Sequence, residues 1–310
     1  MRTLILGAGA LGGYFGARLL AAGRDVTFLV RPGTAKQLAE NGLQVFSPHG
    51  DAYIDRPPTI QAQDIRQPFD LILLSCKSYD LDNAIAAIAP AVGRETAILP
   101  MLNGMAHMGV LEQRFGYERV LGGTCFISAV READGTIRHL NERDGLYFGD
   151  RFAASTPRLE SIAQTLTGAG FNGQLRPVIL QDMWEKWSFI ATLAGITCLM
   201  RAMIGDVVAA DPTLALRMYA ECVSIAAAEG YPPSQTFIDI QNGLISKPGS
   251  SFHASMLRDI EAGAPIEAHQ IVGDLLDRGR SHNLDLPLLE IAYAHLRCYE
   301  ERRKRDLGLS

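Results

Sequence analysis

The first sixteen residues, MRTLILGAGALGGYFG, contain five glycines that begin directly after a short apolar stretch, Thr3–Leu6. Glycine inside a strand or helix costs roughly 0.5–1 kcal/mol relative to alanine, so such a cluster needs a structural reason. Gly7, Gly9 and Gly12 have the spacing G-x-G-x-x-G between this predicted strand and a predicted helix at Tyr14–Ala22. In that context the glycines allow a tight turn, the approach of a pyrophosphate and close packing of helix on strand. The stretch predicts a dinucleotide site; a glycine-rich turn without a ligand is the alternative.

Further apolar stretches alternate with helical patterns along the first half of the chain. Predicted strands lie at 25–30, 69–76, 97–102 and 120–128, and shorter antiparallel strands at 136–140 and 145–148 are joined by a polar turn. Strands that alternate with helices are typical of a mostly parallel sheet. From Asp182 onward the periodicity is helical throughout. We predict an α/β fold, with an N-terminal Rossmann-type dinucleotide-binding domain at residues 1–177 and a C-terminal all-helical domain at 178–310.

Composition excludes several other classes of protein. Of the 310 residues, 47% are hydrophobic and 20% charged, and the net charge of −5 argues against a nucleic-acid partner. The five cysteines are widely spaced without C-x-x-C, which indicates reduced thiols and a cytoplasmic location and argues against a metal site. The most apolar later segment, 189–200, is too short to cross a bilayer, so we expect no membrane partner.

The end of the second predicted strand bears on the choice of cofactor. NAD enzymes usually carry an acidic residue there for the ribose 2′-hydroxyl, but this strand ends in Arg31. A guanidinium attracts a 2′-phosphate and can bind it with two hydrogen bonds, and Lys36 on the next helix is a second candidate. This favours NADP(H) over NAD(H), unless Arg31 is simply a solvated surface residue.

Three residues of the second half are candidates for chemistry on a substrate. Lys186 stands on an otherwise apolar helix, where partial desolvation would lower its pKa toward a value useful for proton transfer. A lysine that extends from the edge of a buried helix to solvent would give the same pattern. Ser255 begins a predicted helix and Glu267 falls on the next one, so hydroxyl and carboxylate could converge, although both also suit an exposed surface.

Several motifs together resemble the ketopantoate reductase (2-dehydropantoate 2-reductase) family almost from end to end. They are GAGALGG, Arg31, SCK with Lys77, LNGM with Asn103, MWEK with Lys186, and SSFHASMLRDIEAGAPIE with Ser255 and Glu267. Each motif is modest, but their order and spacing are specific. The resemblance implies NADPH-dependent reduction of ketopantoate to pantoate in pantothenate biosynthesis, in a cleft between the two domains.

The resemblance also implies a role for each matching residue. The glycine turn, Gly7 to Gly12 with Ala8, Ala10 and Leu11, would hold the pyrophosphate, and Arg31 the 2′-phosphate. Lys77 and Asn103 would lie beside the cofactor, with Asn103 also on the substrate. Lys186 would protonate the keto oxygen and Ser255 would bind the substrate carboxylate. Glu267 would contact the substrate hydroxyl or the cofactor and tune Lys186.

One departure from the family pattern puts the substrate in doubt. The family often carries asparagine four and eight residues after the lysine, where this chain has Ile190 and Ala194. Apolar side chains cannot replace amide hydrogen bonds to a substrate hydroxyl. The alternatives are a related NADP-dependent reductase or dehydrogenase for another 2-keto or hydroxy acid, and an NADP(H)-binding regulatory protein without turnover. The helical domain offers a face for a homodimer.

Overall fold

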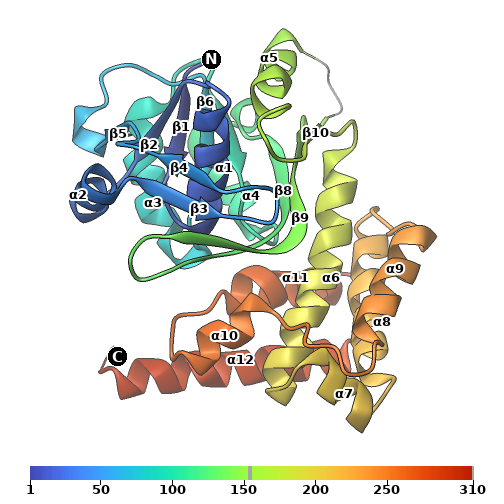
Figure 1. Cartoon of the computed structure of the whole chain (residues 1–310). Helices are drawn as coiled ribbons and strands as arrows, with labels where there is room; N and C mark the ends of the chain where they lie inside the picture. The colour runs from blue at the N-terminus through green and yellow to red at the C-terminus, as the bar shows by residue number, and fades with distance from the viewer. Residues whose placement is uncertain (153–155, 309–310) are drawn as a thin grey trace. The chain divides into compact units, whose positions relative to one another are not determined.

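The computed structural model describes residues 1–152 and 156–308, and they form two compact units (Figure 1). Unit 1 comprises 1–102 and 107–179, and unit 2 comprises 103–106 and 180–310. The sequence placed the change at 177/178 and assigned the segment 103–106 to the first domain. The structure groups this segment with the helices of the second half instead, and the contacts responsible are described below.

Unit 1 is built on a parallel sheet of five strands in the order β5-β2-β1-β6-β7. The strands are β1 (Thr3–Leu6), β2 (Val26–Leu29), β5 (Thr59–Ile60), β6 (Leu71–Leu74) and β7 (Ala97–Pro100). All four residues of β6 and of β7 are buried, as expected for strands covered on both faces. The chain leaves the central strand β1 toward β2 on one side, and β6 lies on the other. In open α/β sheets, ligands bind at the carboxyl edge beside such a reversal of strand order.

The glycines after β1 allow helix α1 (Ala10–Ala21) to pack closely on both sides. A Cβ on Gly12 would overlap the Gly7 carbonyl oxygen, and a Cβ on Gly16 would overlap the ring of Phe28 in the first sheet. On another face of the helix, a Cβ on Gly13 would overlap the side chain of Ile137 in a second sheet. The glycine-rich sequence therefore places α1 between two sheets.

The second sheet of unit 1 has the order β10-β9-β3-β4, with β8 also paired to β9. Its strands are β3 (Leu43–Phe46), β4 (Ala52–Ile54), β8 (Gly122–Arg131), β9 (Ile137–Gly149) and β10 (Gly173–Leu175). The residues predicted as short strands at 136–140 and 145–148 are in strand conformation except Thr136, but the polar turn predicted between them is wrong, because β9 runs through those residues without a break. The register of β8 on β9 shifts between Ile127 and Ala129, and there the Ser128 amide donates to Asn141 Oδ1 at 2.8 Å.

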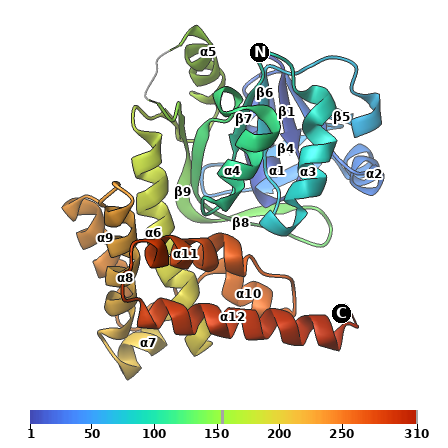
Figure 2. The ribbon, with the colours of Figure 1, turned by 180° about the vertical axis from the view of Figure 1, so that it is seen from behind.

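The remaining helices of unit 1 complete its layers. They are α2 (Pro32–Asn41), α3 (Leu81–Ile88), α4 (Ala106–Phe115, whose first residue belongs to unit 2) and α5 (Pro157–Leu166), with the short turns η1 (Ala62–Asp64), η2 (Ser78–Asp80), η3 (Ala89–Ala91) and η4 (Tyr117–Arg119). Figure 2 shows α3 and α4 in front of the first sheet, on the face opposite α1. The sheet is thus covered on both faces.

Unit 2 is helical among its described residues. Its elements are α6 (Ile179–Met200, whose first residue belongs to unit 1), α7 (Ile204–Ala210), α8 (Leu214–Ala228), α9 (Gln235–Ile245), α10 (Ser255–Glu261), the π-helical turn η5 (His269–Gly273), α11 (Asp274–Ser281) and α12 (Pro287–Asp306). The buried side chains of α8 recur at helical spacing, at Met218, Tyr219, Cys222 and Ile225. The prediction of an α/β fold with a helical second half is confirmed.

Within the described part of the chain, no single helix is long and apolar enough to cross a membrane. The pair α6 and α7 meets the length and composition limits only when taken together, and it is bent by 69°. No disulfide joins the five cysteines, all of which lie in described segments.

A buried histidine on α4 predicts acid sensitivity. His107 is 1% exposed, and burial lowers its pKa to about 3. Below the ordinary value of about 6.5, the unfolded chain takes up a proton that the folded protein does not, so stability falls as the pH decreases. We expect His107→Gln to remove about 2 kcal/mol of the loss in unfolding free energy between pH 7 and pH 5. Urea unfolding of both proteins at both pH values measures this change in unfolding free energy. His253→Gln, at a half-buried position, is the control, and an equal effect there would contradict the prediction.

Candidate active site

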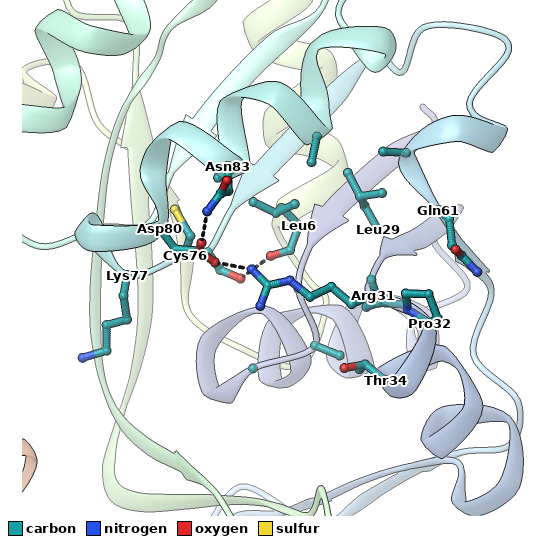
Figure 3. Close-up of a pocket in the computed structure, with 18 of the residues that line it drawn as sticks. Leu6, Leu29, Arg31, Pro32, Thr34, Gln61, Cys76, Lys77, Asp80 and Asn83 are labelled. Atoms are coloured by element: carbon teal, nitrogen blue, oxygen red, sulfur yellow. Dashed lines mark hydrogen bonds and ion pairs between the residues drawn. The ribbon is translucent and has the colours of Figure 1, made fainter. Parts of the chain in front are cut away.

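A cavity of about 500 Å³ lies in unit 1 at the carboxyl ends of β1, β2 and β6 (Figure 3). This volume falls within the usual range for small-molecule and cofactor sites, roughly 300–1,000 Å³. Five of the residues predicted to bind cofactor line it: Gly7, Ala8, Gly9, Arg31 and Lys77. The position agrees with the edge at which a parallel sheet of this order binds ligands.

The glycine turn suits a dinucleotide phosphate. Gly7 has φ of 83°, a conformation that side chains disfavour, and it turns the chain out of β1. A Cβ on Gly9 would meet no protein atom within 4 Å, so the space above this residue is open to a ligand. Ala10, Leu11 and Gly12 do not line the cavity, because they form the first turn of α1. Their expected contribution is the amino end of that helix, which favours an anion.

Arg31 contributes positive charge to the cavity, but it has a partner that the sequence did not predict. Its Nη2 donates to Asp80 Oδ2 at 2.8 Å, and Asn83 Nδ2 donates to the other oxygen of the same carboxylate at 2.8 Å (Figure 3). Asp80 and Asn83 both line the cavity. Lys36 does not line the cavity, and its Nζ lies 3.8 Å from Glu40 Oε1. The only sequence signal for this pairing is that Arg31 follows β2 and Asp80 follows β6, two parallel strands that end at the same edge of the sheet.

In unit 2, Lys186 and Asn103 lie together although 83 positions separate them. Lys186 Nζ donates to Asn103 Oδ1 at 2.9 Å, and both residues are half-buried. On α6 the neighbours of Lys186 on the buried side are Trp187, 1% exposed, and Met183. An ammonium at the border of an apolar helix face is thereby held in a defined direction by a neutral amide oxygen.

The Asn103 backbone is held by a residue that the sequence did not indicate. Gln270 Nε2 donates to the Asn103 carbonyl oxygen at 2.6 Å. This contact and the bond from Lys186 explain why 103–106 belongs to unit 2. Asn103 is not among the residues that line the nucleotide cavity of unit 1, and its place beside the cofactor stays a prediction.

Glu267 and Ser255 occupy different environments in unit 2. Glu267 lies at the start of the predicted helix and not within it: Ala268 is the first helical residue before η5, and the Glu267 carbonyl oxygen accepts from the Ile271 amide at 3.1 Å. Its side chain is only 8% exposed, so the carboxylate is largely shielded from water. Ser255 is exposed as the first residue of α10, where a ligand can reach its hydroxyl.

The two apolar departures on α6 are not compensated by neighbouring hydroxyls. Ile190 is half-buried and Ala194 is 2% exposed. Thr192 and Thr197 are fully buried, and their hydroxyls donate to the Ser188 and Leu193 carbonyl oxygens of the same helix at 2.9 and 2.7 Å. The face of α6 that carries Ile190 and Ala194 is therefore apolar on the C-terminal side of Lys186. Among the described residues, no group of three or more His, Cys, Asp or Glu side chains could hold a metal ion.

Comparison with known proteins identifies the family. Residues 3–151 match the model described as ketopantoate reductase PanE/ApbA, and residues 178–300 match the model of its C-terminal part. An "uncharacterized oxidoreductase YkpB" of Bacillus subtilis (strain 168) is 33% identical over 305 residues, which cover 98% of this chain and 100% of that protein. The chain belongs to the ketopantoate reductase family. It is an oxidoreductase family whose members depend on NAD(P).

Solved structures agree with the fold of this ketopantoate reductase family member. A 2-dehydropantoate 2-reductase from Geobacter metallireducens GS-15 superposes with a TM-score of 0.87 at 29% identity, covering 96% of this chain and 99% of that one. A D-mandelate dehydrogenase, solved with NADH and anilino(oxo)acetate, has a TM-score of 0.84 at 20% identity and covers 98% and 100%. At that identity the second likeness shows the fold alone.

Proposed function

We propose that this chain reduces a 2-keto acid with NADPH, and that ketopantoate is the first substrate to test. The observation that carries the proposal is the hydrogen bond of 2.9 Å between Lys186 Nζ and Asn103 Oδ1, at the border of an apolar helix face. A lysine held in one direction can act as a general acid on a developing alkoxide. Membership of the ketopantoate reductase family supports the same assignment.

The proposed roles follow from the chemistry of keto reduction. A nicotinamide dinucleotide held by the glycine turn and Arg31 would supply a hydride to the keto carbon. As the carbonyl electrons move to oxygen, the Lys186 ammonium gives that oxygen a proton and later regains one from water. Asn103 fixes the direction of Lys186. The Ser255 hydroxyl donates a hydrogen bond to the substrate carboxylate. Glu267 is proposed to accept a hydrogen bond from the substrate hydroxyl or the cofactor.

NADP(H) is proposed as the cofactor because Arg31 lines the cavity at the end of β2. The side chain is 78% exposed, so its guanidinium is accessible to a 2′-phosphate. Lys77, on the same cavity, is proposed to contact the cofactor as well. The glycine turn supports binding of the pyrophosphate.

Asp80 is expected to weaken this preference, because its carboxylate occupies the Arg31 donor that a 2′-phosphate would use. Removing the negative charge of Asp80 from this solvated site should strengthen the binding free energy of the 2′-phosphate by about 1 kcal/mol, which is about fivefold in Kd. We expect Asp80→Asn to lower the Kd for NADPH by about that factor and to leave the Kd for NADH unchanged. Titration of nucleotide fluorescence measures both. Weaker NADPH binding by the variant would mean that Asp80 orients Arg31 instead.

A second candidate substrate is a 2-keto acid with a larger or less polar substituent than ketopantoate. Ile190 and Ala194 favour it, since neither offers a hydrogen bond to the hydroxyl of ketopantoate. Such a substrate would use Lys186 and Ser255 in the same way.

The test is NADPH oxidation, followed by absorbance, with ketopantoate and a panel of 2-keto acids that includes branched and aromatic members. Fast turnover of ketopantoate supports the first candidate. A higher kcat/KM for an apolar 2-keto acid supports the second. No turnover with any of them, in a protein that binds NADPH, would contradict reduction and support a regulatory role.

A further inference from the structure

We propose that Gln270 is a positioning residue for Lys186, acting through the turn at Asn103. The inference rests on the proposed role of Lys186 as the proton donor. It extends that role to a side chain that is not expected to touch substrate or cofactor. Four observations, all within unit 2, support it.

The first observation is the way in which Asn103 is held. Its carbonyl oxygen accepts from Gln270 Nε2 at 2.6 Å, and its side-chain Oδ1 accepts from Lys186 Nζ at 2.9 Å. Two elements, η5 and α6, thus bind the same residue through its main chain and its side chain. If the main-chain oxygen moves, the side-chain oxygen that directs the ammonium moves with it.

The second observation is the burial of Gln270. The residue is only 5% exposed. A buried amide that loses a hydrogen bond is destabilising because water cannot replace that bond, so this side chain has a strong preference for its present position. It therefore holds the Asn103 turn more firmly than an exposed glutamine would.

The third observation is the fit of the turn against η5. Gly104 has φ of 77°, and a Cβ there would overlap the Gln270 carbonyl oxygen. The backbone of the turn therefore lies directly on the backbone of η5, and only glycine fits between them. The separation of Asn103 from η5 is fixed by contact as well as by the hydrogen bond.

The fourth observation joins η5 to α6 directly beside Lys186. Trp187, the next residue on α6, is 1% exposed and donates from Nε1 to the Ile271 carbonyl oxygen at 2.8 Å. Ile271 is the middle residue of η5, a π-helical turn, and such turns occur frequently at functional sites. η5 therefore fixes both the backbone of α6 beside Lys186 and the residue, Asn103, whose side-chain oxygen directs Lys186 Nζ.

The consequence is a specific defect when the Gln270 donor is removed. The Asn103 turn would gain freedom, and Lys186 Nζ would spend less time in the direction needed for proton transfer. Misplacement of a reacting group lowers the rate of the chemical step while ground-state binding is retained. The loss should appear in kcat rather than in the KM for NADPH.

The test compares Gln270→Met with Gln241→Met. Methionine has a similar length but lacks the amide donor, and Gln241 is a glutamine of unit 2 on α9 with 3% exposure and no role in the proposal. We expect Gln270→Met to lower kcat by about tenfold with an unchanged KM for NADPH. Gln241→Met should match the wild type in kcat, and thermal unfolding should show similar midpoints for the two variants. An unchanged kcat for Gln270→Met, or an equal fall in both variants, would overturn the inference.

A second measurement is independent of turnover. Trinitrobenzenesulfonate modifies lysine amines, and the rate at Lys186 can be followed by peptide mass spectrometry without substrate. We expect a changed rate at Lys186 in Gln270→Met only, with the rate at Lys304 equal in all three proteins. If the wild type reduces no 2-keto acid, the proposed function fails, and this rate alone decides the inference: a change at Lys186 supports it, and no change overturns it.

Discussion

Replacing Lys186 by alanine is expected to lower kcat for 2-keto acid reduction by about two to four orders of magnitude, the usual scale for a proton-transfer group. The physical reason is that hydride addition places negative charge on the keto oxygen. Without the ammonium, the oxygen loses its proposed proton donor and depends on weaker acids such as water. The hydrogen bond to Asn103 also disappears in the variant, so the amide loses the group that it directs.

The measurement is steady-state NADPH oxidation at saturating substrate, together with the Kd for NADPH. The Kd should stay within about twofold of the wild type, since the nucleotide cavity is lined by residues of unit 1 alone. Lys304→Ala, at an exposed lysine on α12, is the matched control. Near-normal turnover in Lys186→Ala would refute the assignment of the proton donor.

Arg31→Ala is expected to raise the Kd for NADPH by about tenfold and to change the Kd for NADH by less than about twofold. A charge-assisted hydrogen bond to a phosphate is worth about 1.5–3 kcal/mol, and the lower end applies here because Arg31 is exposed. The 2′-phosphate is the one feature that distinguishes the two dinucleotides. A selective loss therefore assigns Arg31 to it.

Two further measurements make this test specific. Arg31→Lys keeps the charge but loses the planar pair of donors, so its Kd for NADPH should fall between those of wild type and Arg31→Ala. High salt should weaken NADPH binding to the wild type more than to Arg31→Ala. Equal losses of both dinucleotides in Arg31→Ala would mean that the residue supports the cavity in general and does not select the cofactor.

The strands and the glycine turn could be predicted from the sequence because their causes are local. The residues of β6 are uniformly apolar because both faces of the sheet are covered. Gly7 needs a positive φ, and Gly12 needs the absence of a side chain. In β9 the local pattern was misleading, since Asn141 resembles a turn residue in sequence. In the structure its side chain replaces a missing main-chain partner where the register shifts.

Much of the candidate site could not be predicted because it depends on contacts between distant segments. Gln270 and Asn103 are 167 positions apart, and neither has a local pattern that indicates the other. The pairing of Arg31 with Asp80 depends on two strands of one sheet ending at the same edge. Family resemblance indicated Lys186 and Asn103 one by one, but their hydrogen bond required the structure.

The short segment Asn103–Ala106 limits how this protein can be recombined with its relatives. A chimaera joined at 177/178 would take the segment from one parent and the helices that contact it from the other. Gly104 tolerates no side chain against η5, and the Asn103 side chain is bonded to Lys186, so we expect a working chimaera to take residues 103–106 from the same parent as its helices.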